Sequence, residues 1–180
     1  MKIITVSGFK GGTGKTTISA LIGVAAVQEG LRVAALDLDR FTSNLSRFLH
    51  VRKEAGLESP DHFLMMETDK GGDSNSATGR LFGFVEMARI DGYDLMIIDT
   101  SSGHQKDIYD AHLIADVILT PMNESPADMH ALFTPSGAPM APRTNYRDMV
   151  DAARFDRARA GKPKQRWSIC VNRVQALPTR

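Results

Sequence analysis

The stretch KGGTGKTT, residues 10–17, decides the fold of this sequence. It follows directly on a short apolar run, Lys2 to Val6, and it opens a helical pattern of apolar residues. Glycines at these positions let backbone N–H groups turn inward around phosphate oxygens without clashes from side-chain carbons. The positive end of the helix dipole points at the same place. A strand, a glycine-rich turn and a helix in this order are the context that a phosphate-binding loop requires.

Each polar side chain of this loop has a distinct expected role toward a nucleoside triphosphate. Lys15 places its ammonium between the β- and γ-phosphates, and the Thr16 hydroxyl is a ligand for Mg²⁺. Thr17 adds a contact to the α-phosphate. A dinucleotide-binding fingerprint is excluded, because that motif requires a third glycine where Thr17 stands. The remaining loop residues expected to contact the nucleotide are Lys10, Gly11, Gly12, Thr13 and Gly14.

Apolar periods change along the chain in a way that predicts an α/β fold. A long helix is expected from the loop onward and a short one over 43–49, with strands at 2–6, 32–38, 93–99, 116–120 and 167–171. Near-continuous apolar strands are covered on both faces, so we expect a mostly parallel central sheet with helices on both faces. Two turn-rich stretches interrupt the pattern. Residues 51–80 are expected to form a mobile surface loop, and 134–143 an extended connection.

Length and composition limit the class of protein. A chain of 180 residues is the size of one domain, so we expect a single domain over 1–180. The single cysteine, Cys170, cannot form an internal disulfide, which favours the reducing interior of a cell. No apolar run approaches the roughly 20 residues needed to cross a bilayer, and the sequence begins without the pattern of a signal peptide. We therefore expect a cytoplasmic protein.

Acidic residues follow two of the predicted strands, where parallel sheets bind their ligands. Asp37 and Asp39 end the second strand, and Asp99 ends the third. Because the carboxyl ends of parallel strands meet at one edge, we expect these carboxylates beside the phosphate loop. Asp99 matches a Walker B carboxylate, which holds Mg²⁺ mostly through water. The alternative role for a strand-end aspartate is to cap the next helix, which for Asp39 begins near Thr42.

Two details of the loop are typical of one group of ATPases. Phe9 stands where the general phosphate-loop pattern has its first glycine, and Lys10 precedes the GGTGK run. This deviant Walker A motif resembles the ParA/MinD family. The resemblance implies that Lys10 reaches across a two-fold interface to the nucleotide of a second subunit, that Asp39 orients the attacking water and that Asp37 supports the metal shell. The expected catalytic residues are then Lys10, Lys15 and Asp39, and the expected metal site is Thr16, Asp37, Asp39 and Asp99.

The same resemblance implies a base and a branch of the family. Asn172, at the end of the last predicted strand, implies adenine and hence ATP, although a strand-end asparagine also serves as a turn residue. The branch most similar to this sequence is that of MipZ, a division-plane regulator. The resemblance to MipZ rests on residues 91–94 (DGYD), on 120–125 (TPMNES) followed by Asp128, and on Trp167 before 171–173.

The net charge of +1 hides a polarised distribution. The basic C-terminal segment, residues 143–180, holds 10 Lys and Arg against 3 Asp and Glu, whereas the rest of the chain holds 12 against 18. Such a stretch is either a solvated face or a surface for an anionic partner. On DNA it would neutralise backbone phosphates without reading their sequence. The candidate DNA-binding residues are Arg154, Arg157, Arg159, Lys162, Lys164 and Arg166.

Motifs and resemblance together predict a switch. The expected protein is an Mg-ATP-dependent ATPase that forms a homodimer when ATP is bound, binds DNA non-specifically, positions division or DNA-segregation machinery, and hydrolyses ATP slowly. The resemblance implies a ParB-like protein and FtsZ as partners, association with the nucleoid, and no membrane. Three alternatives stay open: a plasmid or chromosome partition ATPase, a small-molecule phosphotransfer or ligase enzyme, and an ATP-binding module without turnover. Family members continue past the Asn172 strand, so we expect the family's C-terminal part to be lacking.

Overall fold

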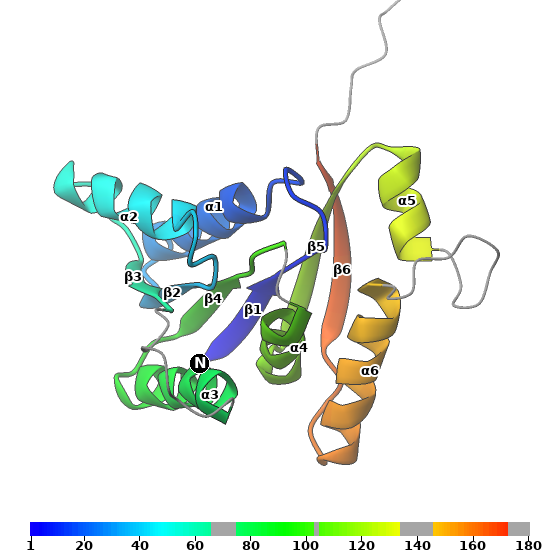
Figure 1. The fold of residues 1–180 in the computed structure, drawn as a ribbon. Helices are drawn as coiled ribbons and strands as arrows, with labels where there is room; N and C mark the ends of the chain where they lie inside the picture. Colours follow the sequence, from blue (N-terminus) through cyan, green and yellow to red (C-terminus); the bar gives the residue numbers. More distant parts are fainter. Residues whose placement is uncertain (66–74, 103–104, 134–145, 173–180) are drawn as a thin grey trace, which may run out of the picture.

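The structure, a computed structural model, describes residues 1–65, 75–102, 105–133 and 146–172. One parallel sheet in the order β3-β2-β4-β1-β5-β6 forms its centre (Figure 1). Its strands are β1 (Lys2–Val6), β2 (Val33–Asp37), β3 (Asp61–Leu64), β4 (Leu95–Asp99), β5 (Val117–Asn123) and β6 (Arg166–Asn172). The helices are α1 (Lys15–Gln28), α2 (Asn44–Glu54), α3 (Asn75–Ile90), α4 (Gln105–Ile114), α5 (Pro126–Phe133) and α6 (Tyr146–Arg159). The predicted α/β fold with a parallel sheet is confirmed.

Helices cover both faces of the sheet. Helices α1 and α2 lie on one face, and α3, α4 and α6 lie on the other (Figure 1). Strand β4 shows why the strands read as continuous apolar runs. Successive side chains of a strand point to opposite faces, so Ile97 packs toward α1 while Met96 and Ile98 pack toward α3 and α4. All three side chains are fully buried.

The expectation of a loop over 51–80 is wrong for three segments of that stretch, while residues 55–60 are outside any helix or strand. Helix α2 continues to Glu54, β3 occupies Asp61–Leu64, and α3 begins at Asn75. Strand β3 lies at the edge of the sheet and pairs only with β2. None of its four residues is buried, so its sequence lacks the apolar run by which the other strands are recognised. The connection expected over 134–143 falls outside the described residues.

Strand β5 is longer than predicted, because it continues through Pro121 to Asn123. Strand β1 pairs with β5 only as far as Leu119, so a proline beyond that point removes no bond from the β1 ladder. This extension carries Asn123 to the edge of the sheet where the loop after β1 lies. No helix within the described ranges is long and apolar enough to cross a membrane.

Candidate functional site

The loop between β1 and α1 has the backbone geometry that its glycines predict. Gly12 and Gly14 adopt φ values of +72° and +91°, in the left-handed region where L side chains are strained. Gly14 is also the N-cap of α1, and a Cβ there would collide with the side-chain nitrogen of Asn172. Gly11 and Gly12 are exposed and Thr13 is buried. The loop therefore stays open at the helix N-terminus, as phosphate binding requires.

Lys15 and Asp99 lie buried beneath this loop. Lys15 Nζ donates a hydrogen bond to the Lys10 carbonyl at 2.8 Å. Burial lowers the pKa of Lys15, while Asp99 and Asp39 oppose that shift. Asp99 accepts a hydrogen bond from the Thr16 hydroxyl at 2.7 Å and one from the Ser19 hydroxyl at 2.9 Å. Burial raises the pKa of Asp99 to about 7, although both hydroxyls favour its charged form.

Asp37 stands directly beside Asp99, because the two residues are paired in the register of β2 and β4. Its carboxylate accepts hydrogen bonds from the backbone N–H groups of Asp39 at 2.9 Å and Ser46 at 3.1 Å. Burial raises the pKa of Asp37, and these backbone hydrogen bonds oppose the shift. Asp37 thus joins the end of β2 to the first turn of α2, behind Asp99.

The Asp39 carboxylate faces its own turn. It accepts hydrogen bonds from the backbone N–H groups of Phe41 and Thr42, each at 3.2 Å, and from the Thr42 hydroxyl at 2.8 Å. These bonds close the turn that precedes α2. The alternative in which Asp39 caps a helix beginning near Thr42 is wrong, because α2 begins at Asn44 and its N-cap is Ser43. The structure therefore brings Asp37, Asp99 and the loop together. The Asp39 carboxylate lies close enough to Lys15 to oppose the lowering of the Lys15 pKa, but its hydrogen bonds are made within its own turn.

The residues at this edge fit Mg²⁺ bound with a nucleotide. Within the described residues, no group of three or more His, Cys, Asp or Glu side chains could hold a metal by itself. Mg²⁺ usually keeps several waters and is completed by substrate phosphates. The Thr16 hydroxyl and the Asp99 carboxylate, already 2.7 Å apart at the start of α1, are an oxygen pair of that kind. Thr16 would be a direct ligand, and Asp99 would hold a metal-bound water.

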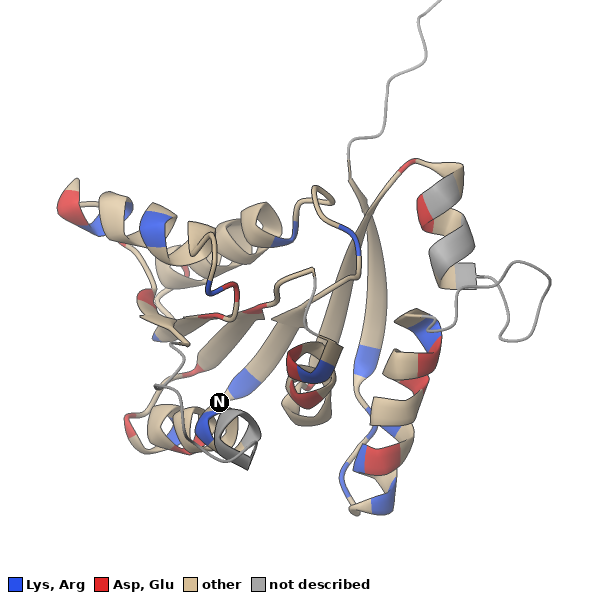
Figure 2. Ribbon diagram, viewed as in Figure 1, with Lys and Arg blue, Asp and Glu red and all other residues tan. Residues whose placement is uncertain are grey.

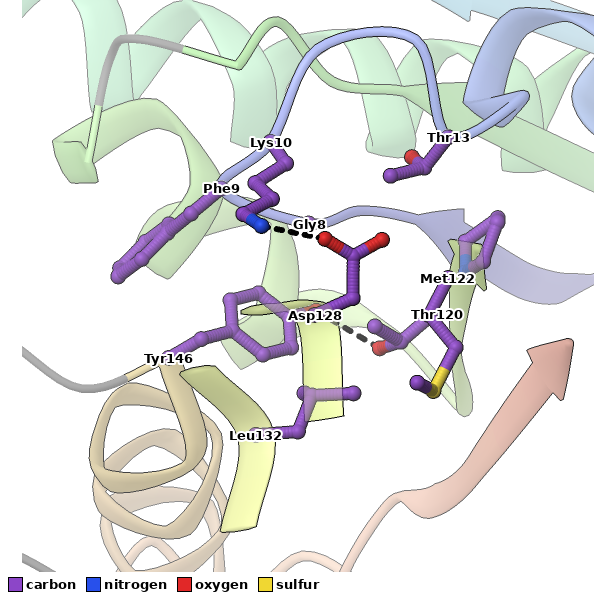
Figure 3. A pocket seen from close by; sticks show the side chains of 10 residues that line it. Gly8, Phe9, Lys10, Thr13, Thr120, Met122, Asp128, Leu132 and Tyr146 are labelled. Carbon is purple, nitrogen blue, oxygen red and sulfur yellow. Dashed lines mark hydrogen bonds and ion pairs between the residues drawn. The ribbon is translucent and has the colours of Figure 1, made fainter. Parts of the chain in front are cut away.

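Lys10 has an intramolecular partner that sequence reasoning missed. Its Nζ lies 2.5 Å from Asp128 Oδ1, and the two side chains point toward one another (Figure 3). The other carboxylate oxygen of Asp128 accepts the backbone N–H of Asn123 at 2.9 Å. Burial acts to raise the pKa of Asp128, but the Lys10 and Asn123 hydrogen bonds outweigh it and lower the pKa. No spacing in the sequence indicates this pair, since 118 residues separate its members.

A small cavity of about 30 Å³ lies beside this ion pair, with room for about one water molecule. Its apolar lining includes Phe9, Met122 and Leu132, and Tyr146 closes its inner side (Figure 3). The Phe9 ring meets the Tyr146 ring edge to face at 5.2 Å. Phe9, which replaces the usual glycine of the loop, is thus a packing residue that fixes the loop to α6.

A buried polar cluster supports the first residue of the loop. Ser7 Oγ lies 2.6 Å from His112 Nε2 and 2.7 Å from the Tyr146 hydroxyl, and that hydroxyl lies 2.9 Å from Thr120 Oγ1. Burial lowers the pKa of His112 to about 3, and burial raises the pKa of Tyr146 to about 12. The cluster is therefore neutral at ordinary pH, and it joins β1 to α4, β5 and α6.

Asn172 lies against the loop at the end of β6. Its Nδ2 donates to the Thr13 carbonyl at 3.1 Å, and it stands beside Asn123 in the register of β5 and β6. Trp167, near the other end of β6, donates from Nε1 to Thr120 Oγ1 at 3.0 Å and packs in the core with Ile118 and Tyr146. Asn172 is thus at the predicted edge of the sheet, whereas Trp167 is a core residue.

The candidate DNA-binding residues lie near the amino ends of the strands, whereas the loop lies at the carboxyl ends. Lys162 and Lys164 precede β6, and Arg166 begins it. These three side chains are exposed. Figure 2 shows several basic residues at the end of α6 and the start of β6, at the bottom of the view. Arg159, also exposed, lies with its guanidinium carbon 5.8 Å from the centre of the Phe155 ring. The candidate nucleotide site lies at the carboxyl ends of the strands, so the two predicted sites are well separated.

Arg157 and Arg154 are engaged by the protein itself. Arg157 donates hydrogen bonds to the carbonyls of Leu113 and Ala115, at 3.1 and 2.6 Å, and forms an ion pair with Asp116 at 3.0 Å. It therefore caps the C-terminus of α4. Arg154 lies 3.6 Å from Asp151 on the same helix. Arg157 is therefore held inside the protein, unlike the exposed cations near it in the sequence.

The comparisons with known proteins agree with this geometry. A family model described as ATPase MipZ matches residues 2–180. A putative septum site-determining protein MinD of Guillardia theta is 25% identical in an alignment of 129 residues that covers 61% of this chain and 48% of that protein. The chain thus matches about half the length of this curated relative.

Solved structures share the fold. The MinC:MinD cell division protein complex of Aquifex aeolicus matches with a TM-score of 0.62 and 19% identity, over 97% of this chain and 70% of that chain. The septum site-determining protein MinD of Pyrococcus horikoshii, complexed with Mg-ADP, matches with a TM-score of 0.53 and 24% identity, over 71% and 60%.

The family model carries the assignment, because it covers nearly the whole chain. At these identities the structural matches show the fold, and they agree with the parallel sheet and its loop. The predicted resemblance is thereby confirmed, and this chain belongs to the MipZ family of ATPases within the ParA/MinD group.

Proposed function

We propose that this chain is a nucleotide-switched ATPase that binds Mg-ATP at the carboxyl edge of the sheet, forms a homodimer in that state and releases it after slow hydrolysis. The observation that carries the proposal is the convergence of Lys15, Thr16 and Asp99 beneath an open glycine loop. Thr16 and Asp99 come from elements 83 residues apart in sequence yet meet at 2.7 Å. Its biological role, from the family, is in cell division or DNA segregation.

In the proposed reaction, a water oxygen bonds to the γ-phosphorus while the bond to the β–γ bridging oxygen breaks. The products are ADP and inorganic phosphate, and both hydrogens of the water end on the phosphate. Bound Mg²⁺ supplies positive charge to the phosphate oxygens. Lys15 supplies a second positive charge at the same oxygens. Asp39 orients the water, and for that its carboxylate leaves the Thr42 hydroxyl and turns toward the nucleotide.

The homodimer is proposed to use Lys10 as a charge donated to the partner's nucleotide. Lys10 is half-exposed, while Asp128 is almost fully buried, so the lysine is the member of the pair that is able to move. A triphosphate carries more negative charge than one carboxylate and so competes for Lys10. The Lys10–Asp128 pair then describes a form in which Lys10 is held back by its own chain.

Non-specific DNA binding is proposed for Arg159, Lys162, Lys164 and Arg166. Their exposed cations lie on one end of the molecule, far from the nucleotide. A single chain offers few such charges, so affinity would rise when a dimer presents two sets at once. A ParB-like protein and FtsZ are proposed as further partners on family membership alone, and the nucleoid as the place of action.

The proposal is tested by sedimentation of the protein with Mg²⁺ and a non-hydrolysable ATP analogue, beside ADP as the control. We expect a dimer with the analogue and a monomer with ADP. The variant Lys15→Gln, which removes the charge beneath the loop, should bind neither nucleotide while remaining folded. A folded protein without measurable affinity for adenine nucleotides in the presence of Mg²⁺ would refute the proposal.

A further inference from the structure

A partly buried ion pair joins the turn that carries Asp39 to the start of α4. Arg40 directly follows Asp39, and Asp107 lies in the first turn of α4. Arg40 Nη2 is 3.0 Å from Asp107 Oδ2, and the two side chains are only 16% and 15% exposed. Nothing in the proposed chemistry so far assigns this pair a role.

The surroundings of the pair screen its charges less than water screens the ion pairs on the surface. It borders a cavity of about 10 Å³ whose wall includes the core residues Leu38, Met65 and Leu81. Apolar side chains exclude water from one side of the pair, so the attraction between the charges is screened less. By contrast, the pair of Lys53 and Asp61 has side chains 65% and 51% exposed, and pairs of that kind contribute little.

The pair connects two segments that both border the nucleotide site. On one side, the Leu38 N–H donates to the Asp99 carbonyl at 2.9 Å, and Asp39 begins its turn immediately afterwards. On the other side, Ser102 lies against the phosphate loop, with its Oγ 3.8 Å from where a Cβ of Gly11 would stand. Helix α4 begins three residues later. The ion pair therefore joins the Asp39 turn to the helix that follows the Asp99 segment in the chain.

The turn between Asp39 and α2 contains a strained backbone conformation at a residue that is not glycine. Ser43 has φ of +48°, in the left-handed region, and it is the N-cap of α2. Among the non-glycine residues that the structure describes, Ser43 alone has a positive φ. Such strain persists only where the surroundings hold it, and it favours a segment with a second arrangement. Arg40 is the residue of this turn that pairs with a partly buried carboxylate at the start of α4.

We propose that Arg40 and Asp107 form a latch that couples the segment after Asp99 to Asp39 and so sets the position of Asp39 for hydrolysis. Arg40 is thereby a positioning residue, which acts through Asp39 rather than on the nucleotide. The inference rests on the proposed ATPase function and adds to it the means by which the two segments move together.

The test is phosphate release as a function of ATP concentration, measured with Arg40→Gln, Asp107→Asn and the double variant. We expect each single variant to lower kcat about tenfold, within the range for directly coupled neighbours. The double variant should lose no more than either single one. Affinity for a non-hydrolysable ATP analogue should stay within about twofold of the unaltered protein, which a merely destabilised site would not achieve.

Matched variants keep the test decisive. Arg47→Gln removes the same charge from an exposed position on α2 and should leave kcat unchanged. Arg40→Lys keeps a cation and should retain most of the rate, and it replaces Arg40→Gln if that variant fails to fold. Unchanged kcat in both single variants would overturn the latch, as would multiplicative losses in the double variant or a loss confined to Arg40→Gln.

Failure of the underlying function looks different. If the unaltered protein binds the ATP analogue but releases no phosphate, the proposed ATPase activity and the latch fall together. If it releases phosphate and the single variants match it, the ATPase proposal stands and the latch alone is overturned.

Discussion

Charged residues are brought together differently at the carboxyl ends of the strands (the carboxyl edge) and at their amino ends (the amino edge). At the carboxyl edge, Lys15, Asp37 and Asp99 arrive from three different elements and lie buried within hydrogen-bond networks. At the amino edge, Lys162 and Lys164 are neighbours in sequence and stand exposed to solvent. Parallel topology assembles the first group, whereas only local sequence assembles the second. Charges gathered by topology therefore indicate a site more strongly than charges gathered by sequence.

The largest effect is expected from a substitution at Gly14, in the phosphate loop at the carboxyl edge. Gly14→Ala places a Cβ at φ +91° and against the Asn172 side chain. We expect loss of nucleotide binding by more than about a hundredfold, with unfolding free energy lowered by about 1–3 kcal/mol from backbone strain. Titration with a fluorescent ATP analogue and denaturant unfolding measure the two effects.

The control for this prediction is Gly83→Ala. Gly83 lies inside α3 with no atom within 4 Å of the Cβ position, so alanine there should stabilise the helix by about 0.5–1 kcal/mol. The double variant Gly14→Ala/Asn172→Ala relieves the collision but not the strain. Full recovery of nucleotide binding in that double variant would contradict the role given to the left-handed backbone.

The next effect concerns His112, the buried support of the loop. Burial lowers the pKa of His112 from 6.5 to about 3. Between these values the unfolded chain binds a proton that the folded chain does not, so stability falls as pH drops through this window. The contribution is about 1.4 kcal/mol per pH unit. We expect the unfolding free energy of His112→Gln to fall less steeply between pH 6 and pH 4 than that of the unaltered protein.

Urea unfolding at several pH values measures this difference. The carboxylates titrate in the same range, but they are common to both proteins and cancel in the comparison of slopes. Parallel slopes would show that His112 is protonated in the folded protein, contrary to its neutral placement beside Ser7.

At the amino edge, substitutions of the exposed lysines and of the internally bonded Arg157 should have different effects. Lys162→Glu/Lys164→Glu should weaken DNA retention about tenfold at moderate salt and reduce its salt dependence, independently of DNA sequence. Arg157→Gln should instead lower unfolding free energy by about 1–3 kcal/mol, because it leaves the carbonyls at the end of α4 and Asp116 without their donor. Filter retention and thermal unfolding of both variants give the contrast. Equal DNA retention by the double variant and the unaltered protein would remove this end as the DNA surface.

The same contrast explains what the sequence could predict. The ends of β1, β2 and β4 were predictable from their apolar runs, and parallel pairing then placed Asp37 and Asp99 beside the loop. Strand β3 was not predictable, because an edge strand needs no apolar run. The role of Arg157 was also hidden, since its partners are carbonyls at the end of α4 and just after it, and the Asp116 carboxylate, which a sequence pattern cannot place. Asp39 was placed at the correct edge, but its carboxylate orientation depends on local hydrogen bonds with Thr42.

The smallest expected effect concerns the ion pair of Lys10 and Asp128 at the carboxyl edge, which sequence reasoning missed. Asp128→Asn keeps an oxygen to accept the Asn123 N–H but removes the charge that holds Lys10. Lys10 is half-exposed, so water weakens the pair, and we expect the ATP-analogue dimer to tighten by only about two- to fivefold. Sedimentation equilibrium measures this change. In a Lys10→Ala background the same substitution should change nothing, because no lysine remains to be released. A weaker dimer in the Asp128→Asn variant would mean that Asp128 orients Lys10 for the partner's nucleotide instead of holding it back.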